Sequence, residues 1–119
     1  MKQIDLKDRT KDFAKRIINL CAKLPKTQHA RLIGNQLFRS GTSVGANYRA
    51  ASRGRSRADF ISKLGIVLEE IDESMYWMEL LIETRIVPAE RLAPLLNEAN
   101  ELTAIIVSRL NTAKKEKDA

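Results

Sequence analysis

Apolar residues recur every three or four positions along four long stretches of the chain, and few helix-breaking residues interrupt them. The 119 residues include only 3 prolines and 5 glycines, too few for the closely spaced turns of an all-β sandwich or barrel. A chain of this length forms one domain. We therefore predict a single all-α domain over residues 1–119.

The first two helices are separated by a proline. The first apolar series stops before Pro25, whose ring is incompatible with a continuing helix, so we predict a helix over about 5–24. Thr27 is the predicted N-cap of a second helix over about 28–53. The first series consists of Leu6, Phe13, Ile17, Leu20 and Leu24.

The second half of the chain repeats this arrangement. Ser56, followed three residues later by an acidic residue, resembles a capping box and predicts a third helix over about 57–85. The fourth helix is expected over about 89–113, where Pro94 either kinks it or delays its start. A polar tail, 114–119, follows. Because the connectors are short, we expect an antiparallel, up-and-down four-helix bundle.

Three glycines lie inside the predicted second helix, at Gly34, Gly41 and Gly45. Each costs about 1 kcal/mol relative to alanine in a helix interior. Close approach of another helix is the simplest compensation for this cost.

Two further stripes predict that the bundle assembles into a homo-oligomer. Small polar residues of the second helix recur at spacings of 4, 3 and 4, and the third helix repeats this spacing with an isoleucine and an indole that would face water in a monomer. An alternative is that Trp77 is a partly exposed surface aromatic. The predicted interface consists of Gln36, Ser40, Ser43, Asn47, Ile66, Glu70, Glu73 and Trp77.

Charge is distributed unevenly along the chain. Residues 1–63 carry 15 basic and 4 acidic side chains, whereas residues 64–119 carry 6 basic and 11 acidic ones. A basic half can hold a polyanion such as nucleic acid, or it can pair with the acidic half of another copy. On the second view, the acidic third helix faces the arginines of a neighbouring copy in a head-to-tail contact that can close into a ring.

A cluster of cations carries the strongest functional signal. Arginine suits phosphate because its planar fork donates two parallel hydrogen bonds, and contacts to phosphate carry little sequence preference. We therefore expect binding to RNA or DNA; the alternative is a solvated helix end with salt bridges between subunits. The candidate nucleic-acid-binding residues are Arg39, Arg49, Arg53, Arg55, Arg57 and Lys63.

Candidate catalytic and metal-binding residues are sparse. His29 is the single histidine and Cys21 the single cysteine, so neither a metal site nor a Cys–His nucleophile is predicted. We expect no cofactor and no enzymatic activity; a metal-dependent nuclease using the acids between Glu69 and Glu73 is a distant alternative. No apolar run approaches a membrane span and the N-terminus has no signal-peptide core, so a cytoplasmic protein is expected.

Two segments carry a family resemblance, Ile33 to Ala51 and Ser56 to Glu70. They contain a Gln-Leu-x-Arg element beginning at Gln36 and a Ser-Val-x-x-Asn element beginning at Ser43. From about residue 13 to 110, the chain resembles the four-helix-bundle family encoded in 23S rRNA intervening sequences. Relatives of that family include the accessory variability proteins of diversity-generating retroelements.

The resemblance implies a bacterial, ring-like homopentamer with a central channel and no catalytic activity. It also implies basic surfaces associated with nucleic acid and, for the retroelement relatives, with a reverse transcriptase. The residues that carry the family pattern are Gln36, Arg39, Ser43, Asn47, Phe60 and Leu64. The chain departs from many members at Gly45, where they have proline, and at Tyr48-Arg-Ala-Ala, where they have Ile-Ala-Glu-Gly. Two functions follow as alternatives: a nucleic-acid-binding accessory protein, or a scaffold whose charged faces mediate assembly or docking of a protein partner.

Overall fold

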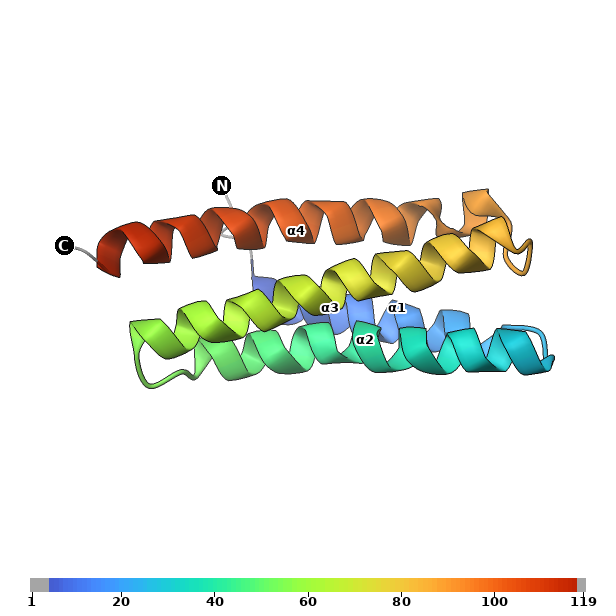
Figure 1. Ribbon diagram of the computed structural model, residues 1–119, viewed down its shortest axis with the longest axis horizontal. Helices are drawn as coiled ribbons and strands as arrows, with labels where there is room; N and C mark the ends of the chain where they lie inside the picture. Colours follow the sequence, from blue (N-terminus) through green and yellow to red (C-terminus); the bar gives the residue numbers. More distant parts are fainter. Residues whose placement is uncertain (1–4, 118–119) are drawn as a thin grey trace.

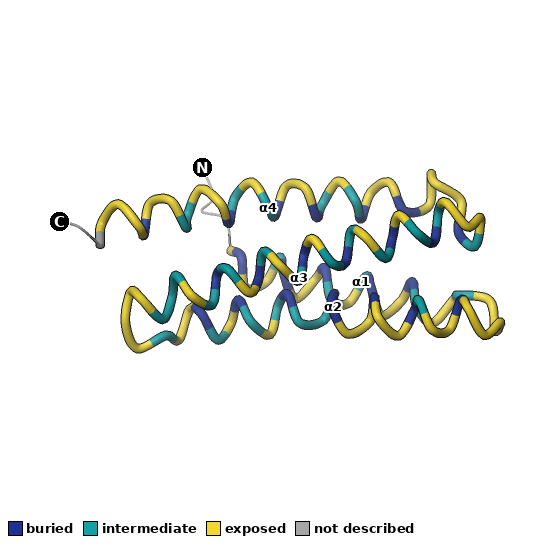
Figure 2. The backbone as a smooth tube through the Cα atoms, viewed as in Figure 1, coloured by how far each residue is buried: buried dark blue, intermediate teal, exposed yellow. Residues whose placement is uncertain are grey.

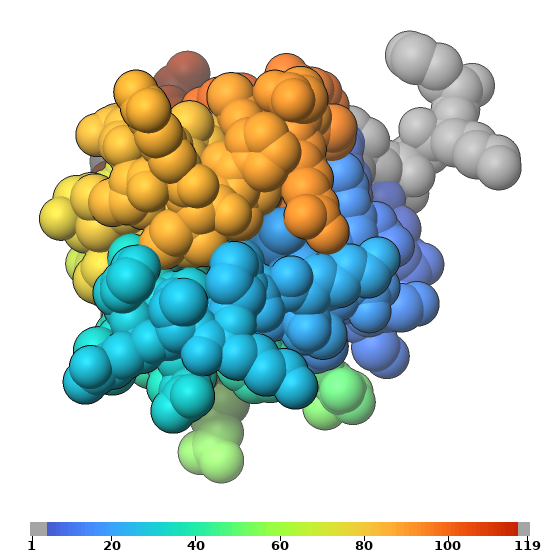
Figure 3. Space-filling model, turned by 90° about the vertical axis from the view of Figure 1, so that its right-hand side faces the viewer, coloured from blue at the N-terminus to red at the C-terminus, as the bar shows by residue number. Residues whose placement is uncertain are grey.

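The computed structural model describes residues 5–117, which form four helices. Consecutive helices run antiparallel, and α4 returns to lie beside α1, so the four helices close an up-and-down bundle (Figure 1). Viewed towards the end that carries the α1–α2 and α3–α4 turns, the four helix ends surround a filled centre (Figure 3). The predicted all-α, up-and-down arrangement is confirmed. The bounds are α1 Leu6–Ala22, α2 Gln28–Ser52, α3 Arg57–Glu83 and α4 Ala89–Lys117.

Side-chain caps define where three of the helices begin. Asp5 accepts hydrogen bonds from the backbone N–H groups of Lys7 and Asp8, and Thr27 accepts one from Ala30. The Ser56 hydroxyl accepts one from the N–H of Asp59 at 3.1 Å. The predicted caps at Thr27 and Ser56 are therefore confirmed.

The core is a continuous column of aliphatic side chains that runs the length of the bundle. In Figure 2 the buried positions of each helix follow one side, which faces the other helices. Phe13 and Ile17 of α1 are fully buried, as are Leu37 of α2, Ile71 of α3 and Ile106 of α4. Burial of this stripe stabilises the helices, which would be marginal in isolation.

The glycines of α2 lie where α1 approaches most closely. A Cβ on Gly41 would come within 2.8 Å of two side-chain carbons of Ile17. A Cβ on Gly45 would lie 3.2 Å from the backbone oxygen of Thr10, and one on Gly34 would lie 2.7 Å from Leu24 Cδ1. The expected close approach is confirmed: α1 of the same chain approaches Gly41 and Gly45, and the turn that follows α1 approaches Gly34.

The bounds differ from the predicted ones mainly at the ends. Helix α4 begins at Ala89, with Pro94 inside it, so the proline does not delay the start. It continues to Lys117, beyond the predicted end at residue 113, because the predicted polar tail begins with strong helix formers and no breaker. Among the helices of residues 5–117, none contains an apolar stretch long enough to traverse a lipid bilayer.

Candidate nucleic-acid interface

Arg49, in the last turn of α2, and Arg53, its C-cap residue, lie near the beginning of α1. They line a groove of about 400 Å³, together with Lys7 and Lys11 of α1. In the part of the chain that the structure describes, none of these four side chains has a carboxylate within ion-pair distance. We call this feature the basic groove; its lining residues are Lys7, Asp8, Lys11, Ala14, Thr42, Gly45, Ala46, Arg49 and Arg53.

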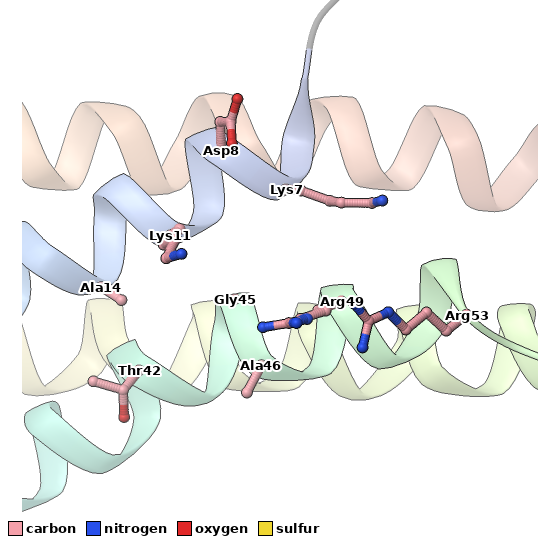
Figure 4. Close-up of a pocket in the computed structure, with 9 residues that line it drawn as sticks. All are labelled: Lys7, Asp8, Lys11, Ala14, Thr42, Gly45, Ala46, Arg49 and Arg53. Carbon is pink, nitrogen blue, oxygen red and sulfur yellow. The ribbon is translucent and has the colours of Figure 1, made fainter.

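The shape of the basic groove follows from its small residues. Gly45 lets α2 approach the α1 backbone at Thr10, and Ala14 and Ala46 add only methyl groups to the lining. Figure 4 shows Arg49 and Arg53 extending along the space between the two helices, while the carboxylate of the neighbouring acid, Asp8, points away from them. The groove therefore presents positive charge over a surface of backbone and short side chains.

The remaining predicted nucleic-acid-binding residues lie outside the groove and meet acidic groups. Arg39 pairs with Glu70, Nη1 to Oε2 at 3.2 Å, and with Glu73. Lys63 pairs with Asp59 at 2.9 Å. The guanidinium of Arg57 lies 3.7 Å from Glu116 of α4, and Arg55 is exposed in the turn between α2 and α3.

Lys63 also affects the ionisation of Asp59, its ion-pair partner near the start of α3. The hydrogen bond from Lys63 lowers the pKa of the Asp59 carboxyl, and the backbone N–H and charge of Arg55 contribute in the same direction. Asp59 therefore stays ionised and offsets positive charge at this corner of the bundle. The six predicted cations do not form one site: Arg49 and Arg53 form part of the groove, and Arg39, Arg57 and Lys63 have acidic partners.

Lys7 and Lys11 are functional candidates that sequence reasoning missed. Together with Ala14 they recur at spacings of 4 and 3, which places them on one side of α1. That stripe was visible in the sequence, but nothing local indicated that it faces the arginines of α2. Arg9, on another side of α1, is instead held by Glu98 and Glu101 of α4, at 2.7 Å each.

The predicted oligomer interface lies mainly along the outer side of the α2–α3 pair. The Arg39 ion pairs with Glu70 and Glu73 bring the two predicted stripes side by side within one chain. Gln36 and Ile66 are exposed, Ile66 at 41%, and Ser43, Asn47, Glu70 and Glu73 are half-buried. The Asn47 side chain donates to the Ser43 carbonyl at 2.9 Å.

Two members of that predicted set are placed differently from the expectation. Ser40 is fully buried between α2 and α3, where its hydroxyl lies 3.0 Å from that of Ser74, so it cannot contribute to an outer surface. Trp77 is half-buried and packs against the core, and its indole N–H donates to Glu73 at 3.2 Å. The alternative interpretation of Trp77, a partly exposed aromatic, describes its position in the single chain.

Other apolar side chains are exposed on the same two helices. Leu32 of α2 is 58% exposed and Tyr76 of α3 is 54% exposed. The Tyr76 ring packs edge-to-face against Trp77, with ring centroids 5.1 Å apart. Leu32 lies on the stripe of Gln36, Arg39 and Ser43, at helical spacing. The outer α2–α3 side therefore combines a central ion-pair cluster with exposed apolar groups.

The candidate metal-binding and nucleophilic residues of the sequence do not come together in the described structure. Within residues 5–117, no three His, Cys, Asp or Glu side chains converge as a metal-binding group. Cys21 is half-buried at the contact of α1 with Gly34, and burial raises the pKa of its thiol to about 11. Such a thiol is protonated near neutral pH and therefore a poor nucleophile.

Comparisons with known proteins agree with this fold and with the sequence motifs that it carries. A family model described as "23S rRNA-intervening sequence protein" matches residues 2–108. The chain belongs to the 23S rRNA-intervening sequence protein family. The resemblance drawn from the Gln36 and Ser43 elements is thereby confirmed.

A solved structure supports membership of the 23S rRNA-intervening sequence protein family. It is that of a protein with unknown function from the S23 ribosomal protein family of Bacteroides thetaiotaomicron. That protein is 42% identical to this chain, and the two structures superimpose with a TM-score of 0.84 over 89% of this chain and 98% of the other. Comparison with curated proteins gives no match.

Proposed function

We propose that this member of the 23S rRNA-intervening sequence protein family is a non-enzymatic, nucleic-acid-binding accessory protein that acts as a homo-oligomer, with five subunits as the family resemblance implies. It contacts RNA or DNA phosphates through its basic surface. The observation that carries this proposal is the basic groove, in which four cations from two helices lie without ion-pair partners among the described residues. Uncompensated cations of this kind attract a polyanion and release its counterions on binding.

The distribution of acidic groups adds support. Three cations elsewhere on the bundle are neutralised locally: Arg9 by two glutamates, Arg39 by two more, and Lys63 by Asp59. Exposed ion pairs of this type contribute little to binding because each cation already has an anionic neighbour. The side of the molecule formed by α1 and the end of α2 therefore differs in charge from the α2–α3 side.

A salt titration tests the proposal. Binding to labelled single-stranded RNA and to duplex DNA is measured across salt concentrations, and light scattering gives the mass in the same buffer. We expect micromolar or tighter binding at low salt, with the logarithm of the association constant falling linearly against the logarithm of salt concentration. Absence of binding at about 50 mM salt, where phosphate contacts are strong, would overturn the proposal.

A charge-removal variant tests the assignment of the surface. Changing Arg49, Arg53, Arg55 and Arg57 to Gln is expected to abolish binding without altering the mass. The matched control changes Lys23, Lys26, Arg31 and Arg85 to Gln, which removes the same charge from the opposite end of the bundle. Equal binding by the two variants would mean that net charge, and not this surface, governs affinity.

A second candidate function is favoured by the exposed apolar side chains on α2 and α3. Leu32, Ile66 and Tyr76 are 58%, 41% and 54% exposed, and exposed apolar groups that gather on one side mark interaction surfaces. On this proposal the chain is a scaffold that self-assembles or docks a protein partner, such as the reverse transcriptase that the retroelement resemblance implies. Removing the four arginines would then lower the oligomer mass, and the wild-type protein would bind no nucleic acid.

A further inference from the structure

The basic groove is built from two pairs of cations on facing helices. Lys7 and Lys11 are four residues apart on α1, and Arg49 of α2 is four residues from Arg53, the C-cap residue of that helix. Four residues of helix advance about 6 Å along the axis. Because α1 and α2 run antiparallel, the pairs form two short parallel rows along the groove (Figure 4). The rows can therefore contact an extended anion at successive points from both sides.

The lining between the two rows leaves room for a bound group. Ala14 and Ala46 carry only methyl side chains, and Gly45 carries none. The Thr42 hydroxyl donates to the carbonyl of Phe38 at 2.7 Å, so it is already used within α2. A tetrahedral phosphate can approach this surface without displacing a bulky side chain, while the longer lysine and arginine side chains reach around it.

The lining also restricts how a nucleic acid can be recognised. Among the residues that the structure describes, no aromatic, asparagine or glutamine side chain lines the groove. Binding of single strands relies on aromatic rings against which unpaired bases stack, and reading of base edges relies on amide or arginine groups that enter a duplex groove. Tyr48, which precedes Arg49 in sequence, is buried in the core, and its hydroxyl lies 3.4 Å from Arg109 of α4. The described lining therefore favours contacts to phosphates over stacking of unpaired bases.

We propose that the basic groove between α1 and α2 binds the phosphodiester backbone of a double-stranded nucleic acid, independently of its sequence, with Lys7 and Lys11 as phosphate-binding residues alongside Arg49 and Arg53. This inference rests on the proposed nucleic-acid-binding function and specifies its site and ligand. A duplex fits better than a single strand, because its bases are already stacked and need no ring from the protein. Free phosphate offers the same chemistry at one point, but it cannot span both rows.

Charge removal on α1 tests the site. The variant Lys7→Gln/Lys11→Gln is compared with Lys23→Gln/Lys26→Gln, which removes two exposed lysines from the other end of α1 and the turn that follows. With a random-sequence duplex as the probe, we expect the first variant to lose affinity about tenfold at low salt and its salt slope to fall by about 2, one unit for each phosphate contact. The control is expected to keep the wild-type slope.

A charge reversal provides a second test that does not depend on the lysines. Ala46→Glu places a carboxylate in the lining of the groove, three residues before Arg49, whereas Ala104→Glu makes the same change at an exposed position of α4. We expect the Ala46→Glu protein to lose duplex binding and the Ala104→Glu protein to retain it. Circular dichroism and thermal unfolding check that both variants fold as the wild type does.

The outcomes separate failure of this inference from failure of the proposed function. No binding of any nucleic acid by the wild type overturns the function, and with it the site. Duplex binding that both lysine variants retain equally, and that Ala46→Glu does not reduce, overturns the groove alone. Tighter binding of the unpaired strand than of its duplex overturns the choice of ligand. If inorganic phosphate, at an equal concentration of phosphate groups, displaces the duplex, the groove is a site for a single anion and the proposal is overturned.

Discussion

Gly41 of α2 packs directly against Ile17 of α1, so closely that a methyl group on Gly41 would lie 2.8 Å from both Cγ1 and Cγ2 of the isoleucine. Ile17 is fully buried, and its branched side chain has few alternative rotamers. The contact brings the backbones of α1 and α2 together along the same line on which Gly45 meets Thr10. The width of the basic groove therefore depends on packing inside the bundle.

Replacement of Gly41 by alanine is expected to destabilise the protein. Overpacking a core typically costs about 1–3 kcal/mol, which exceeds the gain of about 1 kcal/mol in helix propensity or nearly cancels it at the low end. Gly65 of α3 is the matched control, because a Cβ there meets no atom within 4 Å, so Gly65→Ala should stabilise by about 1 kcal/mol. Urea unfolding measures the free energy of unfolding of both variants. A more stable Gly41→Ala protein would contradict the close contact.

Arg85 ends α3 in the left-handed region, with a φ of 61°. The N–H of the next residue, Ile86, donates to the carbonyl of Leu81 at 3.0 Å, which is the pattern of a Schellman cap. Arg85→Gly should raise the free energy of unfolding by about 0.5–1 kcal/mol, because glycine adopts this conformation without a Cβ clash. Arg85→Ala is the control, because it removes the same charge but retains a Cβ in the left-handed conformation. Thermal unfolding should show no increase in stability for this variant.

The buried hydroxyls of Ser40 and Ser74 are coupled across the α2–α3 contact, 3.0 Å apart. Each also lies within hydrogen-bond distance of a carbonyl of its own helix, Leu37 at 3.3 Å and Glu70 at 2.8 Å. We expect each serine-to-alanine change to cost about 1 kcal/mol. The double variant should cost less than the two single losses together, because the second change removes a partner that is already gone. Strictly additive losses in urea unfolding would show that the hydroxyls are independent.

Cys21 should be slow to react with thiol reagents in the folded protein. Burial raises the pKa of its thiol to about 11, so at pH 8 the thiolate fraction is on the order of 100-fold below that of an unperturbed cysteine, whose pKa is about 8.5. Reaction with a disulfide reagent at pH 8 measures this, with the urea-unfolded chain as reference. Equal rates in the folded and unfolded protein would contradict the burial.

The same pKa shift links Cys21 to stability at high pH. The folded pKa lies above the unfolded value, so the stabilising effect is complete below about pH 8.5 and is lost as the pH rises towards 11. Cys21→Ala removes the titrating group, and its stability should depend less on pH across this window. Urea unfolding of both proteins at several pH values in the window makes the comparison.

Much of the fold was predictable because it depends on interactions between residues a few positions apart. The cap at Thr27 acts three residues along the chain, and the apolar stripe that contains Phe13 and Ile17 follows from the period of a helix. The glycines of α2 indicated a close helix, but local pattern did not identify it as α1. Burial of Ser40 was not predicted, since its place in a polar stripe resembles that of its exposed neighbour Gln36.

The sequence by itself determined the four helices, their caps, the excess of positive charge in the first half and the family motifs, because spacing and composition are local properties. Only the tertiary structure decided which cations pair with carboxylates and which line the basic groove. Arg39 meets Glu70, 31 positions away, and lies outside the basic groove. Lys7 and Lys11 line one groove with Arg49 and Arg53, across a helix contact made possible by Gly45. Such contacts depend on how the helices pack, and helix packing arises from the whole core.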